Sequence, residues 1–261
     1  MRRRELTSAR GLDKLVVLGP VFMAAGIAVF GGEHLVRPRV LMQIVPVWMP
    51  ARLFWSYFVG FALLATAVSF VTMKYVRWSA TLLGAMFLLF VLMIHAPNVV
   101  ATPKDRFLWT VALRETAFAG GAWALAGRRL AITSRFLVAI PLILFAVEHF
   151  LHPEFAPGVP LSKLTPAWVP VRPLWGYLTG AVLLVAGLAL LATRRSRIAV
   201  ACAGLVLTLL TLFLYAPILA MASQPPQIAE GLNYVADTLL FAGAVLCEAH
   251  AFGSIRRIVK S

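Results

Sequence analysis

The sequence predicts an all-α polytopic membrane bundle of eight transmembrane helices, arranged as two parallel four-helix repeats. First, 61% of the residues are apolar and 13% are charged, whereas soluble domains carry roughly 25% charged residues. Second, eight apolar runs each approach the roughly 20 residues that a helix needs to cross the hydrocarbon core. They lie near residues 15–31, 53–73, 78–96, 108–126, 136–151, 174–192, 198–216 and 232–252.

The third observation is an internal repeat. GEHLVRP at 32–38 recurs as VEHFLHP at 147–153, and PVWMPARLFWSYFVG at 46–60 recurs as PAWVPVRPLWGYLTG at 166–180 with seven of fifteen residues identical. Apolar bias alone does not repeat Pro, Trp, Arg and a Glu-His pair in fixed register. We therefore expect two units, 1–130 and 131–261, each with four spans, and an even number of spans makes the repeat parallel.

The same features delimit the four spans of each unit in order. The first run ends at the Glu-His pair, and the second begins after the Pro-x-Trp-x-Pro-x-Arg segment. The third ends at His95 before Pro97 in one unit, and at Tyr215 before Pro217 in the other. The fourth contains FAGGAWALA at 118–126 or FAGAVLCEA at 241–249, whose small residues favour close helix packing.

Charge distribution predicts the orientation in the membrane. With both termini cytoplasmic, sixteen of the 24 Lys and Arg residues fall on the cytoplasmic side, as the positive-inside rule requires. The basic start MRRRELTSARGLDK imitates a signal peptide, but no small-residue cleavage pattern follows, so we expect a retained first span. The net charge of +14 then indicates contact with anionic lipid headgroups, and nucleic acid is not an expected partner.

Two classes of membrane protein are disfavoured. The middles of the predicted spans almost lack ionisable residues, whereas ion pumps and channels usually place such groups at mid-depth. Cys202 and Cys247 both fall within predicted spans, so a disulfide-exchange enzyme, which needs exposed cysteine pairs, is not expected.

Polar residues instead gather near the outer ends of the spans, where we expect a pocket. Glu115 and Asp237 lie roughly 7–11 Å below the outer interface, taking about 1.5 Å per residue, and we expect Arg and His residues at the same level as their partners. The candidate ligand-binding residues are Glu33, His34, Arg52, His95, Glu115, Glu148, His149, Arg172 and Asp237.

Several alternatives remain open for these residues. Arg52 and Arg172 begin the second span of each unit and are expected to pair with Glu33 and Glu148, although the surrounding Pro-Trp-Pro segment is also typical of an interface anchor.

The Glu-His pairs could equally be polar helix ends that bond loop backbone. His149 and His152 could ligate a metal, but Arg37 stands at the position equivalent to His152, so no metal site is expected. Glu248 and His250 are expected to be solvated.

Four short motifs resemble those of the DoxX-like family of small bacterial membrane proteins. They are carried by Glu33, His34 and Pro38; Pro46, Trp48 and Pro50; His95, Pro97 and Asn98; and Glu115, Gly120 and Gly121. The resemblance implies a four-helix unit, so this chain is similar to two such units in tandem. It also implies a place beside quinone-linked redox systems, without assigning catalytic residues. In the second copy Tyr215 and Ile218 replace His95 and Asn98.

The sequence therefore favours an accessory or quinone-interacting subunit of a redox system, with a polar pocket in the outer leaflet. The cofactor is unknown, with quinone as the candidate. The chain offers no haem-ligand pair at mid-membrane, no flavin motif and no cysteine relay, so electrons are expected from a redox partner protein. No self-contained catalytic motif is present, and the catalytic residues are unknown. A small-solute or lipid transporter and a purely structural membrane protein are the alternatives.

Overall fold

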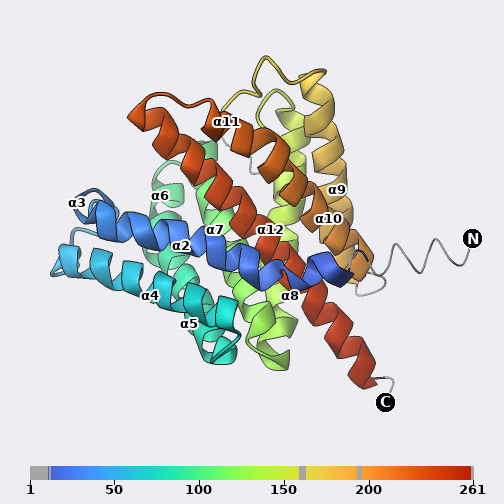
Figure 1. Cartoon of the computed structure of the whole chain (residues 1–261), viewed down its shortest axis with the longest axis horizontal. Helices are drawn as coiled ribbons and strands as arrows, with labels where there is room; N and C mark the ends of the chain where they lie inside the picture. The colour runs from blue at the N-terminus through green and yellow to red at the C-terminus, as the bar shows by residue number, and fades with distance from the viewer. Residues whose placement is uncertain (1–10, 12, 159–162, 193–195, 260–261) are drawn as a thin grey trace, which may run out of the picture.

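A computed structural model describes residues 11, 13–158, 163–192 and 196–259 of the chain, and over these residues it contains helices and no strand (Figure 1). The helices are α2 (Gly19–Val36), α3 (Pro38–Leu41), α4 (Arg52–Thr72), α5 (Val76–Phe90), η1 (Val91–His95), α6 (Ala96–Ala101), α7 (Arg106–Leu125), α8 (Arg128–Leu151), α9 (Arg172–Ala192), α10 (Ser196–Leu210), η2 (Thr211–Tyr215), α11 (Ala216–Ala220) and α12 (Pro225–Val259). The predicted helical fold class is confirmed.

Seven helical segments in the described residues are long and apolar enough to cross a membrane. They are Gly19–Val36, Arg52–Thr72, Val76–Ala101, Arg128–Leu151, Arg172–Ala192, Arg197–Ala220 and Pro225–Ala251. The chain is therefore a multi-pass helical membrane bundle.

One of the eight expected spans, the run near 108–126, corresponds to α7, which is not among these seven. This helix has 20 residues, so its length suffices, but Arg114 and Glu115 and a run of Ala and Gly lower its hydropathy. Every residue from Ala117 to Ala122 is buried, which means that all sides of this turn and a half are covered. The helix packs against α5, α8 and α12. A helix surrounded by other helices needs less apolar surface than one that faces lipid.

The third and sixth spans each contain a π-helical turn that the sequence analysis did not predict. Helix α5 continues through η1 into α6, so the helix does not end at His95 but passes Pro97 and reaches Ala101. The second unit repeats this arrangement with η2 and α11 around Pro217. A proline lacks one backbone donor and crowds the preceding turn, and the wider π turn accommodates it while rotating the residues before it, including His95 and Tyr215.

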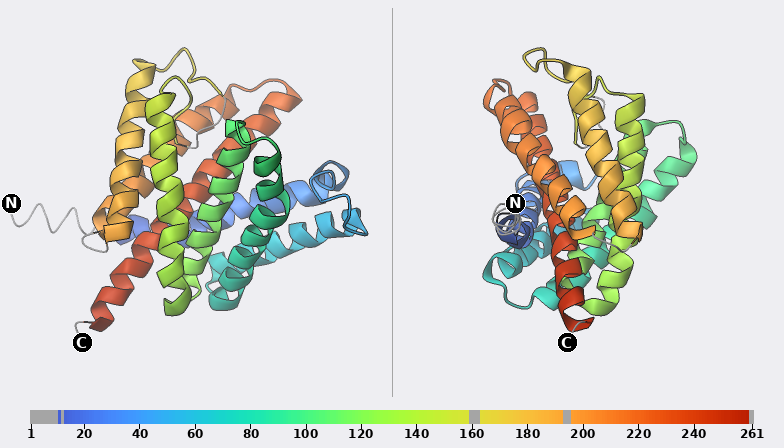
Figure 2. Two further views of the ribbon diagram at one scale, coloured as in Figure 1. Left: turned by 180° about the vertical axis from the view of Figure 1, so that it is seen from behind. Right: turned by 90° about the vertical axis from the view of Figure 1, so that its right-hand side faces the viewer.

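Helix α12 organises the bundle. It runs diagonally through the molecule, with the α2–α4 pair on one side and the α8–α9 pair on the other (Figures 1 and 2). It contacts α2, α7, α8 and α10, and α2 lies antiparallel to it, since Gly19 packs on Cys247 whereas Gly26 packs on Leu240. Helix α7 packs against α8 in turn.

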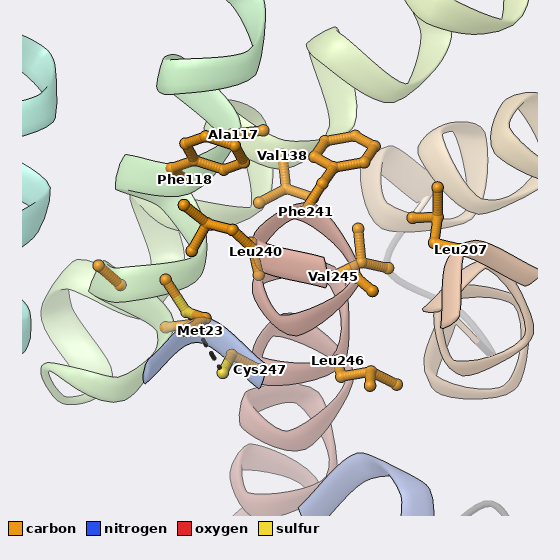
Figure 3. Close-up of a cluster of buried hydrophobic side chains, with 14 of the residues drawn as sticks. Met23, Ala117, Phe118, Val138, Leu207, Leu240, Phe241, Val245, Leu246 and Cys247 are labelled. Atoms are coloured by element: carbon orange, nitrogen blue, oxygen red, sulfur yellow. Dashed lines mark hydrogen bonds between the residues drawn. The ribbon is translucent and has the colours of Figure 1, made fainter. Parts of the chain in front are cut away.

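The core lies where α12 crosses α7. Phe118 and Phe241 contact each other with ring centroids 6.5 Å apart, and a Cβ atom on Gly121 would overlap Ala244. Leu240, Phe241 and Cys247 are fully buried in this region (Figure 3). Small residues let the two backbones approach closely, so dispersion contacts accumulate along the crossing.

Candidate functional site

A buried ion pair joins α7 to α12. Nη1 of Arg114 donates to Oδ2 of Asp237 at 2.5 Å. Their side chains are 14% and 8% exposed, so both charges are largely removed from solvent. Breaking such a pair leaves an uncompensated buried charge, which costs several kcal/mol.

A second pair lies on the neighbouring side of α7. Nε2 of His95 is 3.1 Å from Oε1 of Glu115, and these side chains are 12% and 17% exposed. The π turn η1 ends at His95 and so sets the direction of this ring. Together with the first pair, this contact confirms that Glu115 and Asp237 are partnered by His and Arg residues at their own level.

The central polar cluster, defined as His95, Arg114, Glu115, Asn233 and Asp237, has spare hydrogen-bonding capacity. Four of its buried atoms have no hydrogen-bond partner among the described residues. They are Nε of Arg114, Oε2 of Glu115, Oδ1 of Asn233 and Oδ1 of Asp237. The large majority of buried side-chain polar atoms in proteins are paired, so one free donor and three free acceptors at one place indicate a site that can take a small polar group.

Glu33 lies beside this cluster, close enough to act electrostatically on Asp237. It lines a groove of about 320 Å³ between α2 and the first turns of α12. The sequence-predicted residues Glu33, His95, Glu115 and Asp237 are thus brought into one region of the molecule.

The predicted pairing of Arg52 with Glu33 and of Arg172 with Glu148 is wrong. Nε of Arg52 donates to the carbonyl oxygen of Val45 at 2.9 Å, and Arg172 is exposed. Oε2 of Glu148 instead accepts from Nε of Arg106 at 2.6 Å. Both arginines do begin helices as predicted, but Arg52 turns toward the backbone and Arg172 toward the surface.

The Pro-Trp-Pro segments are architectural in both copies. Nε1 of Trp55 donates to the carbonyl of Pro50 at 3.1 Å, and Nε1 of Trp175 donates to that of Pro170 at 3.0 Å. These repeated bonds fix the loop to the helix that follows it.

His149 has a fixed hydrogen-bonding role. Its Nδ1 lies 2.6 Å from the carbonyl of Phe145, and its Nε2 accepts from the backbone N–H of Gly158 at 2.8 Å. Because a carbonyl only accepts and an N–H only donates, the ring is the neutral Nδ1–H tautomer with both nitrogens occupied. His149 therefore anchors a loop, and it has no nitrogen left for a metal or a ligand. His152 contacts Glu154 instead, so the two histidines do not converge.

His34 repeats half of this arrangement. Its Nδ1 donates to the carbonyl of Phe30 at 2.9 Å, but the segment between this histidine and the Pro-Trp-Pro motif has eleven residues, 35–45, where the second copy has sixteen, 150–165. Pro157 and Gly158 lie in the longer loop. There the Pro157 carbonyl also accepts from the hydroxyl of Tyr215 at 2.8 Å, so Pro157 and Gly158 bind both Tyr215 and His149.

The two Glu-His pairs do not form one site. They lie on α2 and α8, which have no Cα atoms within 8 Å of each other in the described residues. Glu33 faces the α12 side and Glu148 faces Arg106 of α7. Each pair flanks the central α7–α12 crossing from its own side.

The expectation that Glu248 is solvated is wrong, whereas His250 is exposed as expected. Glu248 is 0% exposed, and its Oε2 accepts from Oγ of Ser134 at 2.8 Å. Helix α8 covers this end of α12. The spacing of three and seven residues from the buried Val245 and Phe241 was the available sequence signal.

No protein-family model, curated protein or solved structure matches the chain.

Proposed function

We propose that this chain is a membrane protein of the DoxX-like type, built as two parallel four-helix units, 1–130 and 131–261, with α7 as the eighth span. We place it in a bacterial inner membrane with both termini cytoplasmic. The contacts between α7 and α12 support two units related by an approximate two-fold axis, because residues at matching repeat positions contact each other. These pairs, each 123 residues apart, are Arg114–Asp237, Phe118–Phe241 and Gly121–Ala244.

We propose that the central polar cluster binds the headgroup of a membrane-soluble quinone. The observation that carries the proposal is the set of unpartnered buried atoms on α7 and α12. A quinone carbonyl needs a donor, which Nε of Arg114 supplies, and a quinol hydroxyl needs an acceptor, which Glu115 and Asp237 supply.

The chain's own residues would handle protons, and a partner protein would supply or remove electrons. Reduction of a quinone to a quinol takes up two electrons and two protons. His95 with Glu115 can pass a proton to or from a bound oxygen. The cluster has no redox-active group among the described residues, which is why an electron-transfer partner is part of the proposal.

The test is to purify the full chain in detergent, extract it with organic solvent and quantify quinone against protein. A short-chain quinone should also raise the melting temperature of the stripped protein in a saturable way. Glu115→Gln removes an acceptor charge beside the headgroup, so about tenfold more quinone should be needed for the same rise in melting temperature. Glu154→Gln, at an exposed site, should leave the required quinone concentration unchanged.

The proposal fails if the extract lacks quinone and the melting temperature does not respond to added quinone in either oxidation state. A water-soluble solute that stabilises the same protein, and loses its effect in Glu115→Gln, would point to transport instead.

A further inference from the structure

The groove between α2 and α12 has a charged end and an apolar wall. Its polar lining consists of Glu33 and Arg37, one turn apart, and Arg37 acts electrostatically on Glu33. Its other lining residues are Ala28, Val29, Gly32, Val36, Ile228, Ala229 and Leu232. Val36 and Ile228 are 79% and 44% exposed, so the groove opens on the outer surface of the bundle.

The matching position in the other unit is filled by the protein itself. Glu148, the repeat counterpart of Glu33, is paired with the guanidinium of Arg106 at 2.6 Å. That guanidinium also lies 4.8 Å from the ring centroid of Phe155. A cation on α7 thus neutralises the carboxylate and occupies the space beside it.

Glu33 has no such cation from α12. The Phe-Ala-Gly segments at 118–120 and 241–243 align α7 with α12, and in this alignment Arg106 corresponds to Ala229. Ala229 lines the groove. The methyl group of Ala229 thus stands beside Glu33 where the guanidinium of Arg106 stands beside Glu148. No hydrogen-bond or ion-pair partner of the Glu33 carboxylate is found within the described part of the chain.

We infer that this groove binds a phospholipid with a primary ammonium headgroup, phosphatidylethanolamine. The ammonium takes the place of the Arg106 guanidinium and donates to Glu33, the phosphate lies against Arg37, and an acyl chain follows the apolar wall. A half-buried carboxylate gains most from a donor that is also charged, and the paired charges of Glu33 and Arg37 match a zwitterion.

Other lipid classes fit less well. A choline headgroup has no N–H to donate, and no aromatic residue lines the groove to hold a quaternary ammonium. An anionic lipid without an amine would place its phosphate near Arg37 but leave Glu33 unpaired. The inference rests on the two-unit correspondence proposed above and does not depend on quinone binding.

Lipid retention by the full chain tests the inference. The purified protein is incubated with mixed micelles containing equal amounts of phosphatidylethanolamine, phosphatidylcholine and phosphatidylglycerol, washed, and analysed by native mass spectrometry. We expect about tenfold enrichment of phosphatidylethanolamine over the other two, the ratio that one charge-assisted hydrogen bond supports. Glu33→Gln should reduce this enrichment to less than twofold.

Ala229→Arg is the decisive second variant, because it installs the guanidinium that Arg106 provides in the other unit. It should pair with Glu33, fill the groove and abolish retention, while Glu154→Gln, which removes a carboxylate elsewhere, should retain lipid like the wild type. Size-exclusion profile and melting temperature establish that each variant is folded.

Equal retention of the three lipids by the wild type overturns the inference, and so does wild-type enrichment in a folded Glu33→Gln variant. The quinone response separates this result from the function proposed above. If Glu33→Gln loses phosphatidylethanolamine but keeps the quinone response of the wild type, the groove is a site separate from the central polar cluster. Retention of the lipid without any quinone response removes only the quinone proposal.

Discussion

At the scale of single residues, repeat partners with the same identity have different environments. His34 and His149 are equivalent in sequence, and each donates from Nδ1 to the carbonyl four residues earlier. Only His149 also accepts from a loop amide, that of Gly158. The difference comes from the longer second loop. The two histidines, although equivalent in sequence, therefore contribute differently to the free energy of unfolding.

We predict that His149→Leu destabilises the protein by about 1–3 kcal/mol, because it leaves the buried N–H of Gly158 without an acceptor. Hydrogen exchange followed by mass spectrometry should show faster exchange in the peptide that contains Gly158. His34→Leu is the matched control and should cost less, since it removes no loop contact. Equal losses in the two variants would mean that the loop does not depend on His149.

At the scale of helices, close approach of backbones determines which elements meet. Gly60 lets α4 approach α2 closely, since a Cβ atom added to it would lie 2.8 Å from the Cβ of His34. Gly180 does the same for α9 and α8, where the added Cβ would lie 3.0 Å from the Cβ of His149. Gly121 plays this role where α7 crosses α12. Larger residues at these positions would separate helices along their whole length.

We predict that Gly121→Leu destabilises the bundle by at least about 2 kcal/mol, because its side chain would overlap Ala244 and force α7 away from α12. Thermal unfolding in detergent, followed by circular dichroism, measures the effect. Gly32→Ala serves as the control, because its Cβ would meet nothing within 4 Å, and it should be neutral or slightly stabilising. A wild-type melting temperature in Gly121→Leu would contradict the close crossing.

The sequence was sufficient to locate most helices but not their contacts. Length and hydropathy located the seven span-forming helices, because hydrocarbon selects for those two properties directly. The depth of a residue along its helix can also be predicted by counting residues from the helix end, so Glu115 and Asp237 have the His and Arg partners that were expected. The direction in which a side chain points around its helix axis cannot be predicted from charge alone. For this reason the partner of Glu148 is Arg106 and not the expected Arg172.

At the scale of the whole molecule, the proposed units are interleaved. The first helix of each unit packs against the last helix of the other, α2 on α12 and α8 on α7. Such contacts resemble a two-fold dimer interface, in which one surface meets its own copy. In a dimer of identical units, the position of Arg114 would face a second arginine and repel it. A fused chain can place Asp237 there, so the Arg114–Asp237 pair is a feature that requires two different halves.

The two charges at the α7–α12 crossing should therefore tolerate exchange but not duplication. Arg114→Asp alone places two carboxylates together in a buried site and should lower stability by roughly 3–5 kcal/mol, as expected for a broken buried pair. Asp237→Arg alone should do the same with two guanidinium groups. Because the two positions correspond to each other across the proposed axis, the double variant Arg114→Asp/Asp237→Arg restores one acid and one base and should recover most of the loss.

Melting temperatures of the four proteins in detergent form a double-mutant cycle that isolates the coupling between the two sites. A large favourable coupling is expected, with the double variant close to the wild type. If the double variant is as unstable as the worse single variant, the surroundings of the two positions are not interchangeable, and the approximate two-fold relation does not extend to this level of the bundle. The quinone response of the double variant adds a further distinction, because exchanging the donor and acceptor positions should weaken headgroup binding even where stability is recovered.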